Sequence, residues 1–252
     1  MGLWLWFSMI SSKTDRMSAM AGLTAISAAE LVDTLGLVPH PEGGFFLETW
    51  RAGAEPMTTM GQTALDATRG LVVTDDRSER RPDGDPRRNA LTSIFWVPTS
   101  ACPRLPLAIN LSDHVHYWQG GAAFEYTLFD PATKALSRVV LGPDLRAGQK
   151  LQVPVRGGVW KCGRLLAAAG PGASDCCIIG EAVGPGFDFH DFTWATPAMI
   201  AAACTPEQAA ELAGYVHGDI EAVAGSQSAT LADAAKSYDD TEERARTAAE
   251  RL

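Results

Sequence analysis

The sequence predicts an all-β domain, an antiparallel sandwich or barrel, with short helices near its two ends. After Asn89, short hydrophobic runs follow one another at a spacing of roughly ten residues, as expected for strands joined by tight turns. Turn residues such as Gly-Gly, Asp-Pro and Gly-Pro separate most runs, and no helical periodicity lies between them. The runs are LTSIFWVP, LPLAINL, HVHYW, FEYTLFD, LSRVVLG, KLQVPV, GVWKCGRLLAAA and DCCIIGEAVGPGF.

The composition is that of a soluble globular protein. The chain has 252 residues, of which 46% are hydrophobic and 20% charged, and its 24 glycines and 15 prolines favour a turn-rich fold. The net charge of −9 argues against a nucleic-acid partner, because a basic footprint is missing. The five cysteines are odd in number and form no C-x-x-C pair, which predicts reduced thiols in an intracellular, cytoplasmic protein.

The chain opens with an apolar run over residues 2–10. This run is too short to span a bilayer, and it lacks the basic segment that precedes the apolar core of a secretory signal. Residues 1–26 are therefore predicted to be a disordered extension with no membrane span. A role of this extension in targeting to an organelle stays open.

A short helix is predicted before the β domain. Ser27 can cap its N-terminus, Glu30 completes a capping box, and Gly36 is a good C-terminal stop. The helix leads through a turn into a predicted first strand at residues 45–51.

A second helix is predicted near the other end, with Thr205 as N-cap and Pro206 at the first helical position. We expect one β domain over residues 27–200, followed by a helical segment and polar tail over residues 201–252. Inside the domain, residues 52–88 include the charged run DDRSERRPDGDPRR, which has no apolar periodicity. That run predicts a solvated surface loop.

The segment PHPEGGFF at residues 39–46 is unusual for a turn, because His40 and Glu42 lie among prolines and glycines. The prolines restrict the backbone around His40, whereas Gly43 and Gly44 permit a sharp reversal or a close approach to a ligand. We expect this segment at the mouth of the barrel. There it presents His40 or Glu42 either to a ligand or across a dimer interface.

Glu48 and Arg51 follow on the predicted first strand. Their separation of three places them on opposite faces of an unbroken strand. Arg51 can bind a carboxylate or phosphate group with its guanidinium fork, and a surface salt bridge is the alternative.

The segment NLSDHVHYWQGG contains two histidines, His114 and His116, that project from one face of a strand. Two such imidazoles inside a barrel are half of a metal site. Because two ligands alone do not define a site, the alternative is one solvent-facing histidine and one hydrogen-bonded in the core.

Four segments of the sequence, in their order along the chain, resemble the cupin superfamily. They are LGLVPHPEGGFFLETWR, INLSDHVHYWQGG, VVLGPDLRAGQKLQVPVRGGVWK and GEAVGPGFDFHDF. The four segments are similar to the cupin subfamily of largely unassigned function that opens with P-H-P-E-G-G-aromatic and closes with P-G-F-x-x-x-D-F. The resemblance covers residues 27–194. It implies a double-stranded β-helix, or jelly roll, often a homodimer, with a small-molecule pocket inside the barrel. The related architectures include epimerases of deoxythymidine-diphosphate sugars.

The sequence departs from the general cupin metal motifs. Where a carboxylate ligand is usual it has Gly120 and Gly121, and where a histidine is usual it has Trp160. The nearest acid is Glu125, which could join His114 and His116 only if strand pairing brings it across. No cofactor is required in this interpretation, and a divalent metal at these two histidines and Glu125 is the alternative.

The resemblance and these departures together predict an isomerase-like or epimerase-like enzyme. It would act on a polar, sugar-derived or anionic small molecule by metal-independent acid–base chemistry, with a histidine that titrates near neutral pH. The alternatives are a non-catalytic ligand-binding or sensing cupin and a metal-dependent cupin that uses His114 and His116. The predicted catalytic residues are His116 and Glu125. The predicted ligand-binding residues are His40, Glu42, Arg51, Asn110, Trp118, Tyr126, Trp160, Glu181 and Asp191.

Overall fold

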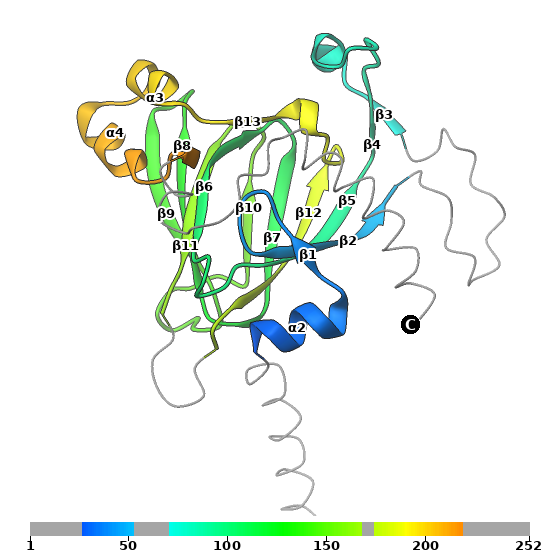
Figure 1. Cartoon of the computed structure of the whole chain (residues 1–252). Coiled ribbons are helices and arrows are strands. Elements are labelled where there is room, and N and C mark those ends of the chain that lie inside the picture. The colour runs from blue at the N-terminus through cyan, green and yellow to red at the C-terminus, as the bar shows by residue number, and fades with distance from the viewer. Residues whose placement is uncertain (1–26, 53–70, 168–173, 219–252) are drawn as a thin grey trace, which may run out of the picture.

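The computed structural model describes residues 27–52, 71–167 and 174–218. Within these ranges two antiparallel sheets face each other and enclose a common interior, with short helices at both ends (Figure 1). The prediction of an all-β jelly-roll barrel is therefore confirmed. The predicted extension at residues 1–26, part of the charged loop at 53–70 and the tail at 219–252 lie outside the described residues.

The two sheets are six-stranded and five-stranded, and a separate pair of strands lies beside them. The larger sheet contains, in spatial order, β1 (Val38–Pro39), β2 (Phe45–Arg51), β5 (Thr92–Val97), β12 (Cys177–Gly184), β7 (Asp113–Gly121) and β10 (Gln152–Val155). The smaller sheet contains β13 (Phe192–Trp194), β6 (Arg104–Asn110), β11 (Trp160–Leu165), β8 (Phe124–Asp130) and β9 (Ala135–Leu141). The separate pair is β3 (Leu71–Val73) and β4 (Arg87–Asn89). Each predicted hydrophobic run overlaps one of the strands β5 to β12.

The helical segments are α2 (Ala28–Leu35), η1 (Asp75–Arg80), η2 (Phe189–Asp191), α3 (Pro197–Ala203) and α4 (Pro206–Ala213). The predicted start of α2 is confirmed, because Ser27 and Glu30 form a capping box, and Gly36 ends the helix in the left-handed conformation. Thr205 caps α4 as predicted, and α3 precedes it without having been predicted. No helix within the described ranges is long and apolar enough to cross a membrane.

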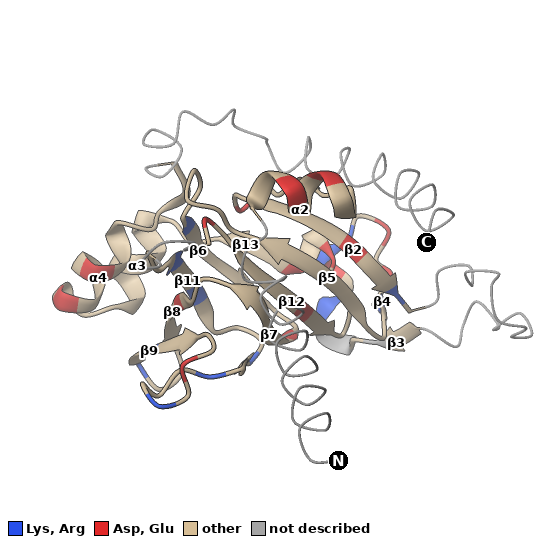
Figure 2. Ribbon diagram, turned by 90° about the horizontal axis from the view of Figure 1, so that it is seen from below, with Lys and Arg blue, Asp and Glu red and all other residues tan. Residues whose placement is uncertain are grey.

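The helices cover the outer faces of the sheets. Leu31 of α2 packs against Val97 and Ile178 of the larger sheet, and the acidic residues of α2 lie on its exposed side (Figure 2). Ile200 of α3 and Leu212 of α4 pack against the outer face of the smaller sheet. Apolar surface buried in this way is the main source of stability for such layers.

The interior between the sheets has its own apolar core, built from the inward residues of both sheets. Strand residues alternate between two faces, so every second residue of a strand belongs to this core. The core residues are Phe46, Trp96, Leu105, Phe124, Tyr126, Leu141, Val153, Val155, Cys177 and Ile179. Buried among them are polar side chains, and these make the candidate site.

The charged run after residue 71 is not simply a solvated loop, which corrects the prediction. Arg77 of η1 and Arg88 of β4 are buried and bind the buried carboxylate of Asp191. Arg88 donates two hydrogen bonds of 2.8 and 2.9 Å to this carboxylate, and Arg77 donates one of 3.1 Å. Arg77 also donates to the Ser112 hydroxyl. The sequence pattern could not predict this burial, because the buried side chains of this segment are paired charges and not apolar residues at regular spacing.

We predict that Asp191→Asn lowers the free energy of unfolding by about 3 kcal/mol, because both buried guanidinium groups lose their main counter-charge. Urea titration followed by circular dichroism measures this change. Asp83→Asn is the matched control, since Asp83 pairs with the partly exposed Arg81 on the surface. Equal stability of the two variants would contradict a structural role for Asp191.

Candidate functional site

A cluster of ionisable side chains occupies the barrel interior, and both sheets contribute to it. His114 and His116 come from β7, Glu181 from β12, Lys161 from β11 and Tyr126 from β8. All are buried, and the side chains of His116 and Tyr126 have no exposed surface. In the β7–β12 pairing Glu181 lies opposite His116, so strand alternation places these groups on the same inward face.

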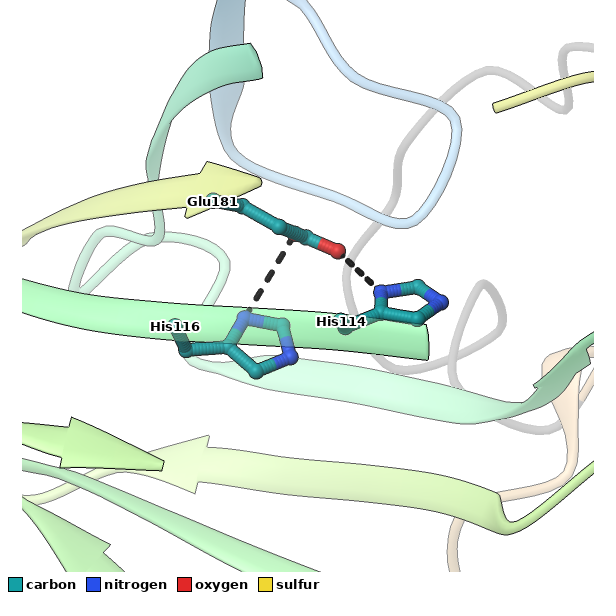
Figure 3. A group of neighbouring side chains, drawn as sticks. All are labelled: His114, His116 and Glu181. Atoms are coloured by element: carbon teal, nitrogen blue, oxygen red, sulfur yellow. Dashed lines mark hydrogen bonds and ion pairs between the residues drawn. The ribbon is translucent and has the colours of Figure 1, made fainter. Parts of the chain in front are cut away.

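Glu181 lies beside both imidazoles (Figure 3). Its Oε1 atom is hydrogen-bonded to Nδ1 of His114, and its Oε2 atom is 3.5 Å from Nδ1 of His116. The two rings stack at a centroid distance of 5.7 Å. A single carboxylate is thus hydrogen-bonded to His114 and close to His116.

Lys161 reaches this group from the opposite sheet. Its Nζ atom is 3.3 Å from Nε2 of His116 and 3.6 Å from Oε1 of Glu181. Because an ammonium group has only donors, Nε2 of His116 accepts the hydrogen bond. In a neutral ring the remaining proton is then on Nδ1, which faces Glu181.

Burial and the Lys161 charge together decide the protonation of the cluster. Burial lowers the pKa of His116 well below its usual value and also lowers the pKa of His114, and the charge of Lys161 acts in the same direction. Burial alone would raise the pKa of Glu181, but Lys161 and the two imidazoles outweigh it and hold that pKa well below normal. At neutral pH the cluster is therefore a buried Lys161–Glu181 ion pair beside two neutral imidazoles.

Several buried polar atoms of the interior have no hydrogen-bond partner among the described residues: Nδ1 of His116, the Tyr126 hydroxyl, Oε1 of Glu42 and Nδ2 of Asn110. Leaving such an atom unpaired costs about 1–3 kcal/mol, so native interiors rarely do so without a reason. Burial raises the pKa of Tyr126 well above normal, which keeps its hydroxyl protonated as a donor. These atoms together offer donors and acceptors to a polar molecule.

The PHPEGG segment forms the turn between β1 and β2 and lies against this interior. The backbone NH of His40 donates to the carbonyl of Gly44, and the NH of Gly43 donates back to His40. Nε1 of Trp96, a core residue, donates to the Gly43 carbonyl at 2.9 Å. The His40 ring packs edge-on against Phe46 at 4.8 Å.

Burial changes the protonation of both polar residues in this turn. It lowers the pKa of His40 to about 4 and raises the pKa of Glu42 to about 7. The charges of Lys161 and Glu181 also act on the pKa values of both residues, in opposite directions. Although Nδ1 of His40 is 3.9 Å from Oε2 of Glu42, a neutral His40 forms no ion pair; its Nδ1 accepts from the Glu42 backbone NH instead.

Residues 29–195 match the family described as Cupin superfamily (DUF985). The chain belongs to this cupin family. It is 31% identical over 190 residues to an uncharacterized protein of Saccharomyces cerevisiae. The aligned region covers 74% of this cupin and 85% of the yeast protein.

Two solved structures share the fold of this cupin. A hypothetical protein from Leishmania major superposes with a TM-score of 0.58 at 24% identity, covering 76% of this chain and 99% of that one. A protein from Shewanella oneidensis superposes with a TM-score of 0.54 at 22% identity, covering 75% and 97%.

The cupin barrel brings many of the predicted site residues to one region. His114, His116, Tyr126 and Glu181 are in direct contact within the cluster, and His40 and Glu42 lie in the adjacent turn. Asn110 shares a face of β6 with Ala108, which pairs with Lys161, and Trp118 packs against the interior core. Glu125, Trp160, Arg51 and Asp191 lie elsewhere.

Glu125 is not carried across to the histidines, which corrects the predicted ligand set and catalytic pair. Since Glu125 precedes the inward-facing Tyr126 on β8, it points to the other face of the sheet. There it pairs with Arg164, with Nε and Oε1 at 2.9 Å. The carboxylate that reaches both histidines is Glu181, because β12 and not β8 pairs with β7.

Trp160 faces the helices and not the barrel interior. Its ring packs edge-on against Phe129 at 5.3 Å, in the core beneath α3 and α4. The next residue, Lys161, points inward, because neighbouring strand residues alternate. Sequence reasoning missed Lys161, and the signal that could have found it was a charged residue at the centre of the otherwise apolar run GVWKCGRLL.

Arg51 and Asp191 are engaged in structural contacts. A bulge between Glu48 and Trp50 interrupts the alternation of β2, so Glu48 and Arg51 lie on the same side, contrary to the prediction. Arg51 binds the Glu48 carboxylate through two hydrogen bonds of 2.8 Å and also contacts Asn89. The Asp191 carboxylate accepts hydrogen bonds from the buried Arg77 and Arg88.

The donor set His114, His116 and Glu181 is of a kind that binds zinc, with ligand atoms within 4.8 Å of one another. The surroundings do not fit a metal, however. The Lys161 ammonium lies 3.3 Å from Nε2 of His116 and 3.6 Å from Oε1 of Glu181, where it repels a divalent cation and already balances Glu181. Lys161 therefore supplies the positive charge of this site.

We predict that Lys161→Met increases affinity for Co²⁺ by at least roughly tenfold, because it leaves the carboxylate and both imidazoles without a counter-charge. Visible absorption of bound Co²⁺ and metal analysis after dialysis measure the gain. Lys161→Arg should show no gain, and neither should Lys134→Met, which removes an exposed lysine. Equal Co²⁺ uptake by the wild type and Lys161→Met would contradict this role of Lys161.

Proposed function

We propose that this cupin is an isomerase-like or epimerase-like enzyme that acts on a small polar substrate inside the barrel by metal-independent acid–base chemistry. The observation that carries the proposal is a buried Lys161–His116–Glu181 chain next to polar atoms that lack partners. An interior meant only to be stable would pair or remove such groups.

The charges of the interior favour a substrate whose reacting part is uncharged. Lys161 and Glu181 balance each other, and His114 and His116 are neutral. The Tyr126 hydroxyl and the Asn110 amide offer donors to hydroxyl or carbonyl oxygens. A hydroxy-carbonyl compound such as a sugar has the matching groups.

The proposed reaction is proton transfer at a carbon next to a carbonyl. When substrate enters, the Lys161 ammonium transfers its hydrogen bond from Nε2 of His116 to the carbonyl oxygen. The freed Nε2 lone pair takes the carbon-bound proton, and the electron pair of the C–H bond forms an enolate whose oxygen faces Lys161. Glu181 stabilises the imidazolium that results. Return of a proton from His116 to the same face regenerates the substrate, whereas a proton from a second acid on the opposite face gives an epimer, with no oxidant or reductant involved.

We expect the wild type to exchange a carbon-bound hydrogen of its substrate with deuterium oxide. Aldoses, ketoses, hydroxy acids and sugar nucleotides are first screened by thermal shift, since a ligand of the folded state raises the melting temperature. Compounds that bind are then incubated in deuterium oxide and followed by NMR and mass spectrometry. His116→Gln should lower the exchange rate by at least about 100-fold while still binding the same compound.

His190→Gln is the matched control, because His190 is an exposed histidine whose ring pairs with Asp188 and not with the cluster. Unchanged exchange in His116→Gln would contradict the acid–base role. The same unpaired atoms would also serve a non-catalytic ligand-binding cupin. Compounds that raise the melting temperature without any hydrogen exchange would favour that alternative.

A further inference from the structure

We propose that Glu42, held by the PHPEGG turn, is the second proton-transfer residue of this site and delivers a proton to the substrate face opposite His116. This inference rests on the proposed function. It assigns to the enzyme a two-base inversion of a stereocentre, in which one residue removes a proton and the other supplies one.

Glu42 approaches the interior from a different side than His116. The turn that carries it joins β1 and β2 at one edge of the larger sheet, and β7 lies beyond β5 and β12 in the same sheet. The β1 edge and β7 are therefore separate parts of this wall, with β2, β5 and β12 between them. A substrate between them would have His116 on one face and Glu42 on another.

One carboxyl oxygen of Glu42 lacks a hydrogen-bond partner among the described residues, so it can bind a substrate atom. This atom, Oε1, is buried, and the Glu42 side chain is only 14% exposed. The turn is fixed, because Trp96 binds the Gly43 carbonyl and because both glycines have positive φ. A Cβ at Gly44 would lie 2.5 Å from the Val97 carbonyl oxygen, so the close approach needs glycine.

The groups around Glu42 keep its carboxyl protonated near neutral pH. Burial raises its pKa to about 7, which outweighs the opposite effect of Lys161, and Glu181 adds to the rise. His40 in the same turn is neutral and supplies no positive charge, and Tyr126 faces the same interior with its hydroxyl protonated. A carboxylic acid that titrates near the working pH is well matched to donate a proton.

Tyr126 fits this second role less well. Its ring packs on the His116 ring at a centroid distance of 4.8 Å, so it stands on the same side of a substrate as His116. Burial raises its pKa well above normal, so it holds its proton at neutral pH. Hydrogen bonding to the substrate oxygen is therefore the role that suits Tyr126.

The step balances as a proton relay. His116 takes a proton from carbon, the enolate forms, and the Glu42 carboxyl gives its proton to the opposite face of that carbon. The enolate electron pair forms the new C–H bond, Glu42 is left as a carboxylate, and His116 as an imidazolium. Exchange with water returns both residues to their starting protonation.

Deuterium incorporation from deuterium oxide distinguishes the role of Glu42 from that of His116. The substrates are the compounds that bind in the thermal-shift screen. The wild type should place deuterium in the inverted product. Glu42→Gln should lose inversion by at least about 100-fold, yet still exchange deuterium into recovered starting compound through His116. Glu79→Gln, at an exposed glutamate, is the matched control and should behave as wild type. Inversion at the wild-type rate in Glu42→Gln would overturn the inference alone; absence of both exchange and inversion in the wild type would overturn the proposed function with it.

The pH dependence gives a second test of the same residue. Inversion needs protonated Glu42, so the rate of inversion should fall as pH rises through about 7, the pKa of Glu42, whereas the rate of exchange into recovered substrate should not.

The stability of the fold follows the same titration. The contribution of neutral Glu42 to the free energy of unfolding is full below the usual carboxyl pKa and is lost as pH rises through about 7. The melting temperature of the wild type should therefore drop relative to Glu42→Gln between about pH 5 and pH 8. Parallel melting curves and an unchanged rate profile would contradict a buried titrating Glu42.

Discussion

The buried ion pair between Lys161 and Glu181 is the interaction on which the interior of this barrel depends. It joins the two sheets, because Lys161 comes from β11 and Glu181 from β12. Neither charge could remain in the interior alone, since transfer of an unpaired ion from water costs several kcal/mol. With both present, the two histidines stay neutral and the interior carries a compensated set of charges.

This pair also gives a physical reason why two same-face histidines of a cupin need not serve as metal ligands. A metal site concentrates positive charge where imidazole and carboxylate ligands converge. Here an ammonium group lies at that point, within 3.6 Å of both His116 and Glu181. A lysine differs from a metal in that its proton and position can change during a reaction, which suits acid–base chemistry.

The rest of the architecture holds this interior in place. The helices α2, α3 and α4 bury the outer faces of the two sheets, so that both inner faces remain available for polar residues. At the barrel rim, the arginines of η1 and β4 bind Asp191, and the PHPEGG turn is fixed by Trp96 and two glycines. The segment that first suggested a polar turn is therefore a fixed part of the wall, with the Oε1 atom of Glu42 buried in it.

Sequence by itself determined strands β2 and β5 to β12, the caps of α2 and α4 and the shared face of His114 and His116, because these follow from local periodicity and turn chemistry. The jelly-roll class rested on the resemblance to cupins. Tertiary structure alone decided which distant residues meet them. Pairing of β7 with β12 selected Glu181 over Glu125, and the alternation of β11 selected Lys161 over Trp160. Strand partners and bulges depend on contacts between segments far apart in the chain, and a shift of one residue reverses the face of every side chain.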